Sequence, residues 1–127
     1  MRGIVCFTAA IAALASSAAA TAKPAAFDIK HTTWTFTDKD RTRVIETIDA
    51  DGNFIANSRA GKHLDHGTSV MKDGKACFTS AMTKEGEVCW TTPPHALPIG
   101  RSFLTKSDKG ERLRVTRVAY KPLSMPK

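Results

Sequence analysis

The chain has 127 residues and a formal net charge of +7 at pH 7, from 19 Lys and Arg against 12 Asp and Glu. The positive charge favours solubility and weak attraction to anionic partners, but it does not define a fold. No stretch after the first 22 residues is long and apolar enough to span a membrane. No nucleic-acid recognition motif occurs either, so we do not expect a nucleic-acid partner.

The first 22 residues have the layout of a helical secretory signal peptide. Met1-Arg2 is a positive start, an apolar run follows, and Ala15 to Ala22 is small and Ala-rich. This pattern predicts cleavage near Ala20 or Ala22 and a periplasmic or secreted protein. The alternative, a retained anchor, would need about 20 strongly apolar residues, and this run is shorter. Cys6 leaves with the signal.

The remaining chain of roughly 105 residues has the size of one domain. We expect a flexible leader over residues 23–31, a β-domain over 32–120 and a tail over 121–127. Phe27 and Ile29 of the leader could dock on the domain.

Short runs with β-favouring residues and polar turns follow one another along the domain. In Thr32 to Asp38, Trp34 and Phe36 point one way and the threonines point the other. The further predicted strands outside the central stretch are Arg41 to Ile48, Phe54 to Ser58, Ser102 to Ser107 and Arg112 to Tyr120. Between them, the region from Ser58 to His66 is expected to be a link and a loop.

The segment Asp49-Ala50-Asp51-Gly52-Asn53 resembles a fragment of a calcium loop. The EF-hand loop needs Gly at its sixth position and Glu at its twelfth. Counted from Asp49, Gly52 is fourth and Ala60 is twelfth. We therefore expect a hairpin turn here, with a bound cation as the alternative.

The central stretch Gly67 to Thr91 predicts three antiparallel strands tied by a disulfide between Cys77 and Cys89. Asp73-Gly74 suits a two-residue type I′ turn. If the cysteines face each other, a set of apolar residues shares one face of the sheet because side chains alternate. That set is Met71, Ala76, Phe78, Val88 and Trp90. The alternative is two free buried cysteines, but an exported chain favours the bridge.

About seven or eight short strands without a helix pattern predict an all-β antiparallel meander, either a lipocalin-like barrel or a sandwich. In so small a barrel we expect the large aromatic residues to fill the core rather than line a cavity. These residues are Trp34, Phe36, Phe78 and Trp90.

His63, Asp65 and His66 are the nearest approach to a metal-ligand cluster. Two histidines and a carboxylate could hold zinc or copper, with His31 or His95 as a further ligand. Residues three apart in a strand face opposite ways, so they would converge only in a turn. Exposed loop residues without a metal are the favoured interpretation, and we expect no cofactor.

The C-terminal hairpin is strongly basic through Lys106, Lys109, Arg112, Arg114 and Arg117. One interpretation is a patch that binds an anionic protein or an envelope polymer. The favoured one is an edge hairpin whose charges prevent edge-to-edge pairing. Because no nucleophile motif is present and both remaining cysteines are assigned to the bridge, we do not expect an enzyme.

The pattern Trp34-x-Phe36, the Asp-Gly turns, Cys77-Phe78 and Cys89-Trp90 resembles uncharacterised small exported one-disulfide β-rich proteins of alphaproteobacteria. That resemblance implies export and a β-rich domain, but no catalytic or binding residue. Small periplasmic lysozyme and protease inhibitors are an analogy at the level of architecture.

The leading hypothesis is a monomeric exported binding or inhibitor-like module. The alternatives are a lipocalin-like carrier of a small apolar ligand and a metal-binding envelope protein that uses His63, Asp65 and His66. A cavity of about 300 Å³ or more inside the barrel would favour the carrier.

Overall fold

Eight antiparallel strands follow one another along the chain in a computed structural model that describes residues 3, 10, 12–15 and 23–126. The predicted signal peptide lies almost wholly outside the described residues. The strands are β1 (Thr32–Thr37), β2 (Arg43–Ile48), β3 (Asn53–Ser58), β4 (His63–Lys72), β5 (Lys75–Ser80), β6 (Glu87–Thr91), β7 (Ser102–Lys106) and β8 (Arg112–Val118).

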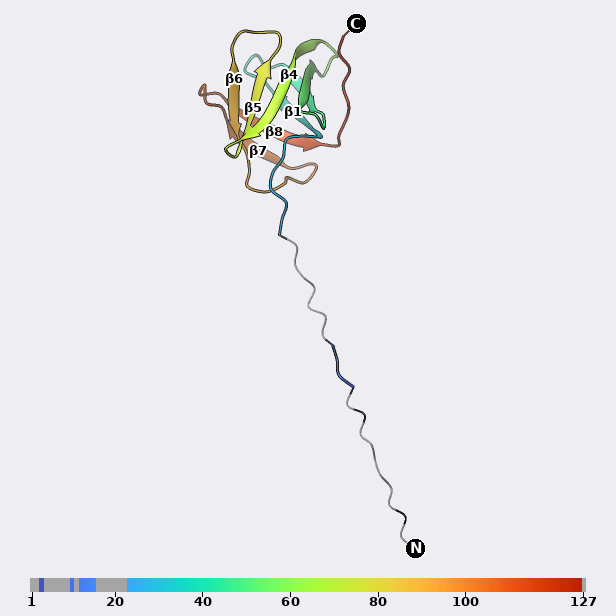
Figure 1. Ribbon diagram of the computed structural model, residues 1–127. Coiled ribbons are helices and arrows are strands. Elements are labelled where there is room, and N and C mark those ends of the chain that lie inside the picture. Colours follow the sequence, from blue (N-terminus) through green and yellow to red (C-terminus); the bar gives the residue numbers. More distant parts are fainter. Residues whose placement is uncertain (1–2, 4–9, 11, 16–22, 127) are drawn as a thin grey trace.

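All eight strands belong to one sheet with the order β6-β5-β4-β3-β2-β1-β8-β7. The two end strands, β6 and β7, approach each other, and the sheet curls into a nearly closed barrel (Figure 1). The prediction of an all-β meander is therefore confirmed, and the barrel, rather than the sandwich, is the architecture.

The seam between β6 and β7 is held by a few specific hydrogen bonds instead of a full ladder. The Asp108 N–H donates to the Cys89 carbonyl at 3.0 Å, and the Cys89 N–H donates to the Asp108 carboxylate at 3.2 Å. The Thr105 hydroxyl donates to the Thr91 carbonyl at 2.7 Å. These bonds satisfy backbone groups that would otherwise form two exposed sheet edges.

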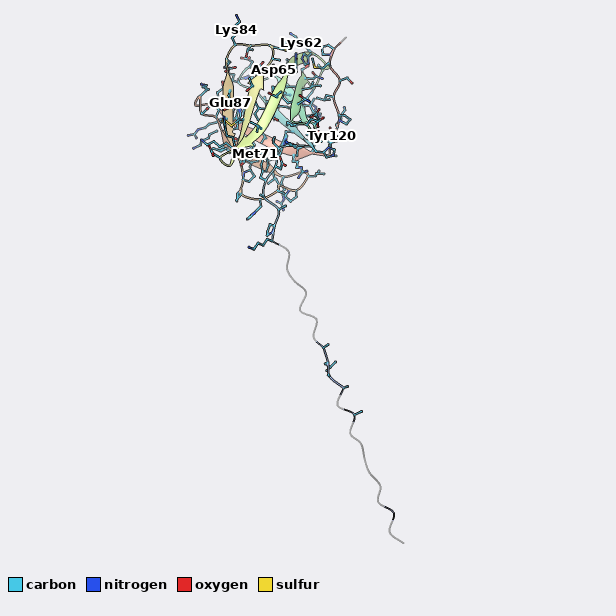
Figure 2. The ribbon with its side chains drawn as sticks, viewed as in Figure 1. Lys62, Asp65, Met71, Lys84, Glu87 and Tyr120 are labelled. Atoms are coloured by element: carbon cyan, nitrogen blue, oxygen red, sulfur yellow. A yellow bond between two sulfur atoms is a disulfide. The ribbon has the colours of Figure 1, made fainter. Side chains whose placement is uncertain are left out.

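The barrel has two ends that differ in what covers them. The β1–β2, β3–β4, β5–β6 and β7–β8 turns form one end, marked by Lys62 and Lys84 in Figure 2. Met71 in the same figure lies toward the other end, where the β4–β5 turn is found. Phe27 and Ile29 are buried in the core, so their predicted docking is confirmed.

The C-terminal tail begins on the outer surface of β1 and β2. The Lys121 N–H donates to the Thr33 hydroxyl at 2.8 Å, and the Thr47 hydroxyl donates to the Lys121 carbonyl. Thr33 and Thr47 also hydrogen-bond to each other at 2.9 Å. This contact explains why two outward-facing threonines are buried.

The Asp49 carboxylate organises the β2–β3 turn. It accepts hydrogen bonds at 2.9 Å from the N–H groups of Asp51 and Asn53. Gly52 adopts a φ of 87°, which glycine reaches without a steric penalty. The predicted hairpin turn is confirmed.

The region from His63 to His66 is not the loop that the sequence predicts. It forms the first part of β4 and pairs with β3, with an irregularity in the register at Ala56 and Asn57. Leu64 is the extra residue, because Asp65 pairs with Ala56 and His63 pairs with Asn57. A β-bulge of this kind disguises the two-residue alternation on which sequence patterns depend.

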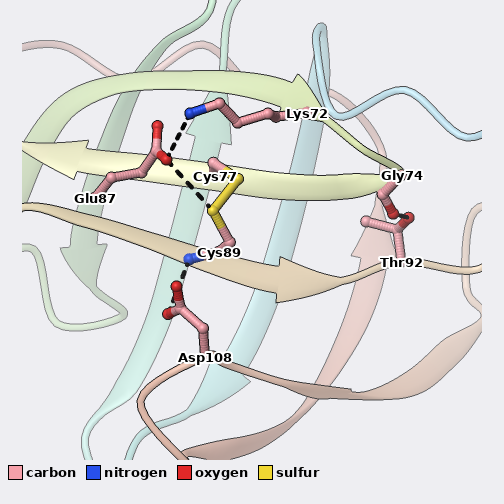
Figure 3. Close-up of a disulfide and its surroundings, with 7 residues drawn as sticks. All are labelled: Lys72, Gly74, Cys77, Glu87, Cys89, Thr92 and Asp108. Carbon is pink, nitrogen blue, oxygen red and sulfur yellow. Dashed lines mark hydrogen bonds and ion pairs between the residues drawn. A yellow bond between two sulfur atoms is a disulfide. The ribbon is translucent and has the colours of Figure 1, made fainter.

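The central strands have the predicted register and the predicted disulfide. Cys77 pairs with Cys89, Ala76 with Trp90, and Phe78 with Val88. The Cys77–Cys89 bond lies on the outer face of β5 and β6, and Figure 3 shows it beside Glu87, which forms an ion pair with Lys72 at 2.9 Å. The bond therefore fixes β6, the strand that closes the seam, to its neighbour.

Replacement of both bridge cysteines by alanine in a chain of residues 23–127 should lower the free energy of unfolding by about 3 kcal/mol, because a short closed loop is released in the unfolded chain. Chemical denaturation followed by circular dichroism measures this change. Dithiothreitol added to the wild type serves as the control that leaves both side chains in place. An unchanged midpoint in both experiments would contradict a stabilising bridge.

Candidate ligand-binding cavity

The barrel contains a cavity of about 530 Å³. Aromatic and aliphatic side chains from six strands and the N-terminal segment form most of its wall. The apolar lining residues are Phe27, Ile29, Trp34, Phe36, Ile48, Ala76, Phe78, Trp90, Phe103, Leu113 and Val115. This volume lies within the range of about 300–1,000 Å³ that is typical of small-molecule sites.

The expectation that the aromatic residues fill the core is met in part, since Trp34 belongs to the buried core cluster and Phe78 packs against that cluster. All four of them, Trp34, Phe36, Phe78 and Trp90, line the cavity. One reason is that a small side chain stands opposite a large one on the wall. Ala76 of β5 lines the cavity and pairs with Trp90 of β6. A large residue opposite a small one leaves space that neither of them fills.

Gly67 shows how tightly β4 is packed behind the cavity wall. A Cβ atom at this position would lie 2.0 Å from the Thr79 carbonyl oxygen and 3.0 Å from the Phe54 ring. The Phe54 ring in turn makes an edge-to-face contact with Phe78, with centroids 5.4 Å apart. The position of the Phe54 ring against Phe78 therefore depends on glycine at one position of β4.

The two ends of the cavity differ. Phe27 and Ile29 lie at one end, and polar residues of the β1–β2 and β7–β8 turns lie at the other. We refer to the second end, lined by Asp38, Lys39, Asp40, Glu111 and Arg112, as the mouth. Lys39 and Glu111 form an ion pair across it at 3.5 Å, and both side chains are substantially exposed. An exposed pair of this kind contributes little stability, so a ligand could separate it at small cost.

Glu46 is an ionisable group on the wall of the cavity. It points inward because it pairs with Trp34 on β1 and with Ala56 on β3, and the alternation places all three on the inner face. Burial, and secondarily the nearby Asp65 charge, raise the pKa of Glu46 to about 8. At neutral pH its carboxyl group is therefore protonated and can donate a hydrogen bond into the cavity.

Asp65 lies in the same transverse row, separated from Glu46 by Ala56. Its carboxylate accepts a hydrogen bond from the Ser80 hydroxyl at 2.6 Å and another from the His66 N–H at 2.8 Å. Within the part of the chain that the structure describes, no such donor reaches Glu46, whose pKa is raised by burial and by the Asp65 charge. The two acids therefore have different environments, and Glu46 is the one available to a ligand.

The β-bulge brings His63 and His66 to the same outer face of the sheet. From the sequence, the two histidines were expected to converge only in a turn. The His63 Nδ1 and the Asn57 Oδ1 lie 2.8 Å apart, and the His63 Nε2 and the His66 Nδ1 lie 3.0 Å apart. Because the amide oxygen only accepts, His63 donates from Nδ1 and accepts at Nε2 in its neutral form.

Asp65 does not join the two histidines, since its carboxylate bonds to Ser80. Within the described residues, the group of three potential ligands that gathers closely is Cys77, Glu87 and Cys89, and two of these form the disulfide. The metal site at His63, Asp65 and His66 stays a hypothesis, with two histidines together and no third ligand from Asp65.

The predicted basic residues of the C-terminal hairpin separate into two groups. Lys106, Arg112 and Arg114 are exposed on the outer alternation of β7 and β8, and Lys109 is exposed in the turn. Arg117 belongs to the inner alternation and is half-buried, and its guanidinium donates to the Leu97 carbonyl at 2.6 Å. Arg117 thus anchors the β6–β7 loop rather than extending an outer patch.

Sequence reasoning missed the inward position of Glu46 and its relation to Asp65. The available signal was the position of Glu46, two residues from both Val44 and Ile48, because residues i and i+2 of a strand share a face. The alternation within β2 therefore indicated that Glu46 faces inward with these two apolar residues. The partner Asp65 was hidden by the bulge.

Comparison with protein-family models, with curated proteins and with solved structures finds no match for the chain. Across residues 3, 10, 12–15 and 23–126, no helix is long and apolar enough to cross a membrane. Function therefore has to be argued from the cavity and the surface.

The raised pKa of Glu46 predicts that stability depends on pH. The folded protein keeps the proton on the Glu46 carboxyl group, whereas the unfolded chain loses it above the ordinary pKa of 4.5. The free energy of unfolding should therefore fall as pH rises from 4.5 to about 8, by up to about 1.4 kcal/mol per pH unit, and level off above that. Urea denaturation at several pH values, with wild type and Glu46→Gln, measures this dependence.

Glu46→Gln should flatten the profile in this window. Glu85→Gln, which removes an exposed carboxyl group from the β5–β6 turn, is the control. Equal flattening by both substitutions would contradict the assignment to Glu46.

Proposed function

We propose that this protein is an exported carrier that holds a small molecule with an apolar body inside the barrel. The observation that supports this proposal is the cavity of about 530 Å³ with its aromatic wall. An unfilled apolar space lowers the stability of a small domain, so a ligand that occupies it would recover dispersion contacts. Of the hypotheses drawn from the sequence, the carrier is the one that this cavity favours.

The cavity also suggests the chemistry of the ligand. Phe78, Trp90 and Phe103 would contact an apolar skeleton, and the protonated Glu46 would donate a hydrogen bond. The matching group on the ligand is a hydrogen-bond acceptor such as a carbonyl or an ether oxygen. The ligand would enter at the mouth and displace the Lys39–Glu111 ion pair.

A pair of leucine substitutions tests occupation of the cavity. Leu113 lines the cavity on β8, whereas Leu104 on the adjacent β7 points outward and is 49% exposed. Leu113→Trp should fill part of the space and weaken binding of the neutral apolar probe N-phenyl-1-naphthylamine by about tenfold or more, equivalent to about 1.4 kcal/mol. Probe fluorescence measures the affinity in the mature protein.

Leu104→Trp is the matched control and should bind the probe as the wild type does. Circular dichroism establishes that both variants are folded. Wild-type affinity in Leu113→Trp, or an equal loss in both variants, would contradict binding inside the barrel.

Binding of a neutral apolar ligand should also weaken as pH rises through about 8. Above this value Glu46 becomes charged, and an apolar ligand would then have to displace the water around a carboxylate. Titrations of the same probe between pH 6 and pH 9 measure the effect. Glu46→Gln keeps the position neutral and should remove the decline. A decline that persists in this variant would assign it to another group.

A further inference from the structure

Three arginines gather on the outer face of the barrel, away from the cavity. Arg43, Arg59 and Arg114 line a depression of about 340 Å³ together with Thr35, Phe36, Thr37 and Thr116. All three arginines are exposed. They come from β2, from the turn after β3, and from β8, so the cluster is invisible along the sequence.

Antiparallel register places these arginines in one line across the barrel. Arg43 pairs with Thr37 on β1. The Arg59 N–H donates to the Arg43 carbonyl at 2.8 Å, which sets Arg59 beside Arg43. On the other side, Thr35 pairs with Thr116, and Arg114, two residues before Thr116 on β8, borders the same depression as Thr37. We call Arg114, Arg43 and Arg59 the arginine row.

The arginine row has no protein partner within the part of the chain that the structure describes. The ion pairs there join Lys39 to Glu111 and Lys72 to Glu87. The hydrogen bonds of arginine side chains there involve Arg117. Like charges on neighbouring strands repel each other, so Arg43 beside Arg59 is unfavourable without a counter-ion.

Edge protection does not account for the arginine row. Charges that prevent edge-to-edge pairing belong on edge strands. β2 and β8 are both interior strands, because β2 lies between β1 and β3, and β8 lies between β1 and β7. Solubility alone would be served as well by charges spread over the surface.

We propose that the arginine row binds a phosphate group. A guanidinium presents planar pairs of N–H donors that match the oxygens of a phosphate, and several of them can share one dianion. The hydroxyl groups of Thr35 and Thr37 supply further donors around the same depression, whereas the Thr116 hydroxyl already hydrogen-bonds to the Ser102 hydroxyl at 2.6 Å. The site lies on the outer side of the sheet, since Arg43, Arg114 and the three threonines belong to the outer alternation of β1, β2 and β8, and Phe36 borders both the depression and the cavity.

The test is a titration of the ¹⁵N-labelled mature protein with inorganic phosphate at constant ionic strength. We expect saturable shifts of the backbone amides of Thr35, Thr37 and Thr116. Arg43→Gln/Arg114→Gln should weaken binding by about tenfold or more, because two charge-assisted contacts are lost. Lys75→Gln/Lys84→Gln removes the same charge from two exposed positions outside the depression and should leave the affinity nearly unchanged.

Shifts that do not saturate, or an equal loss of affinity in both double variants, would overturn the proposal and leave non-specific attraction to a cationic protein. Vesicles that contain phosphatidylglycerol distinguish the source of the phosphate. With a positive titration, co-sedimentation that is lost in Arg43→Gln/Arg114→Gln places the phosphate on a lipid. Absence of co-sedimentation places it on a soluble molecule.

Discussion

Closure of the sheet between β6 and β7 is the constraint on which the rest of the structure depends. Only a closed sheet has an inside, and the seam consists of a few bonds around Cys89, Thr91 and Asp108. The disulfide holds β6 against β5 and so keeps it in position for these bonds (Figure 3). The cavity, the inward position of Glu46 and the outward arginine row all follow from a sheet that is closed in this register.

Alternation of side chains across the closed sheet separates two kinds of chemistry. Its inner face carries aromatic residues and a protonated acid, which suits an apolar molecule with one hydrogen-bond acceptor. Its outer face carries arginine and threonine, which suits an anion. Because adjacent residues of one strand face opposite ways, Thr35 and Thr37 border the outer depression and not the cavity, and Phe36 between them borders both.

Local signals were sufficient to predict most of the fold. The Asp73-Gly74 turn and the two cysteines determine one register, and the alternation of Trp34 and Phe36 identifies an inner face. The site was less accessible, since a cavity depends on how residues from six strands fill a common volume. The bulge at Leu64 and the transverse arginine row are products of pairing between strands, and neither leaves a pattern along the chain.

A hollow interior is the central claim, and xenon tests it most directly. Xenon enters apolar cavities in crystals without requiring a specific ligand. Crystals of the mature protein pressurised with xenon should show an anomalous peak among Phe78, Trp90 and Phe103. An interior without xenon, in which these three rings meet and leave no space, would contradict the account.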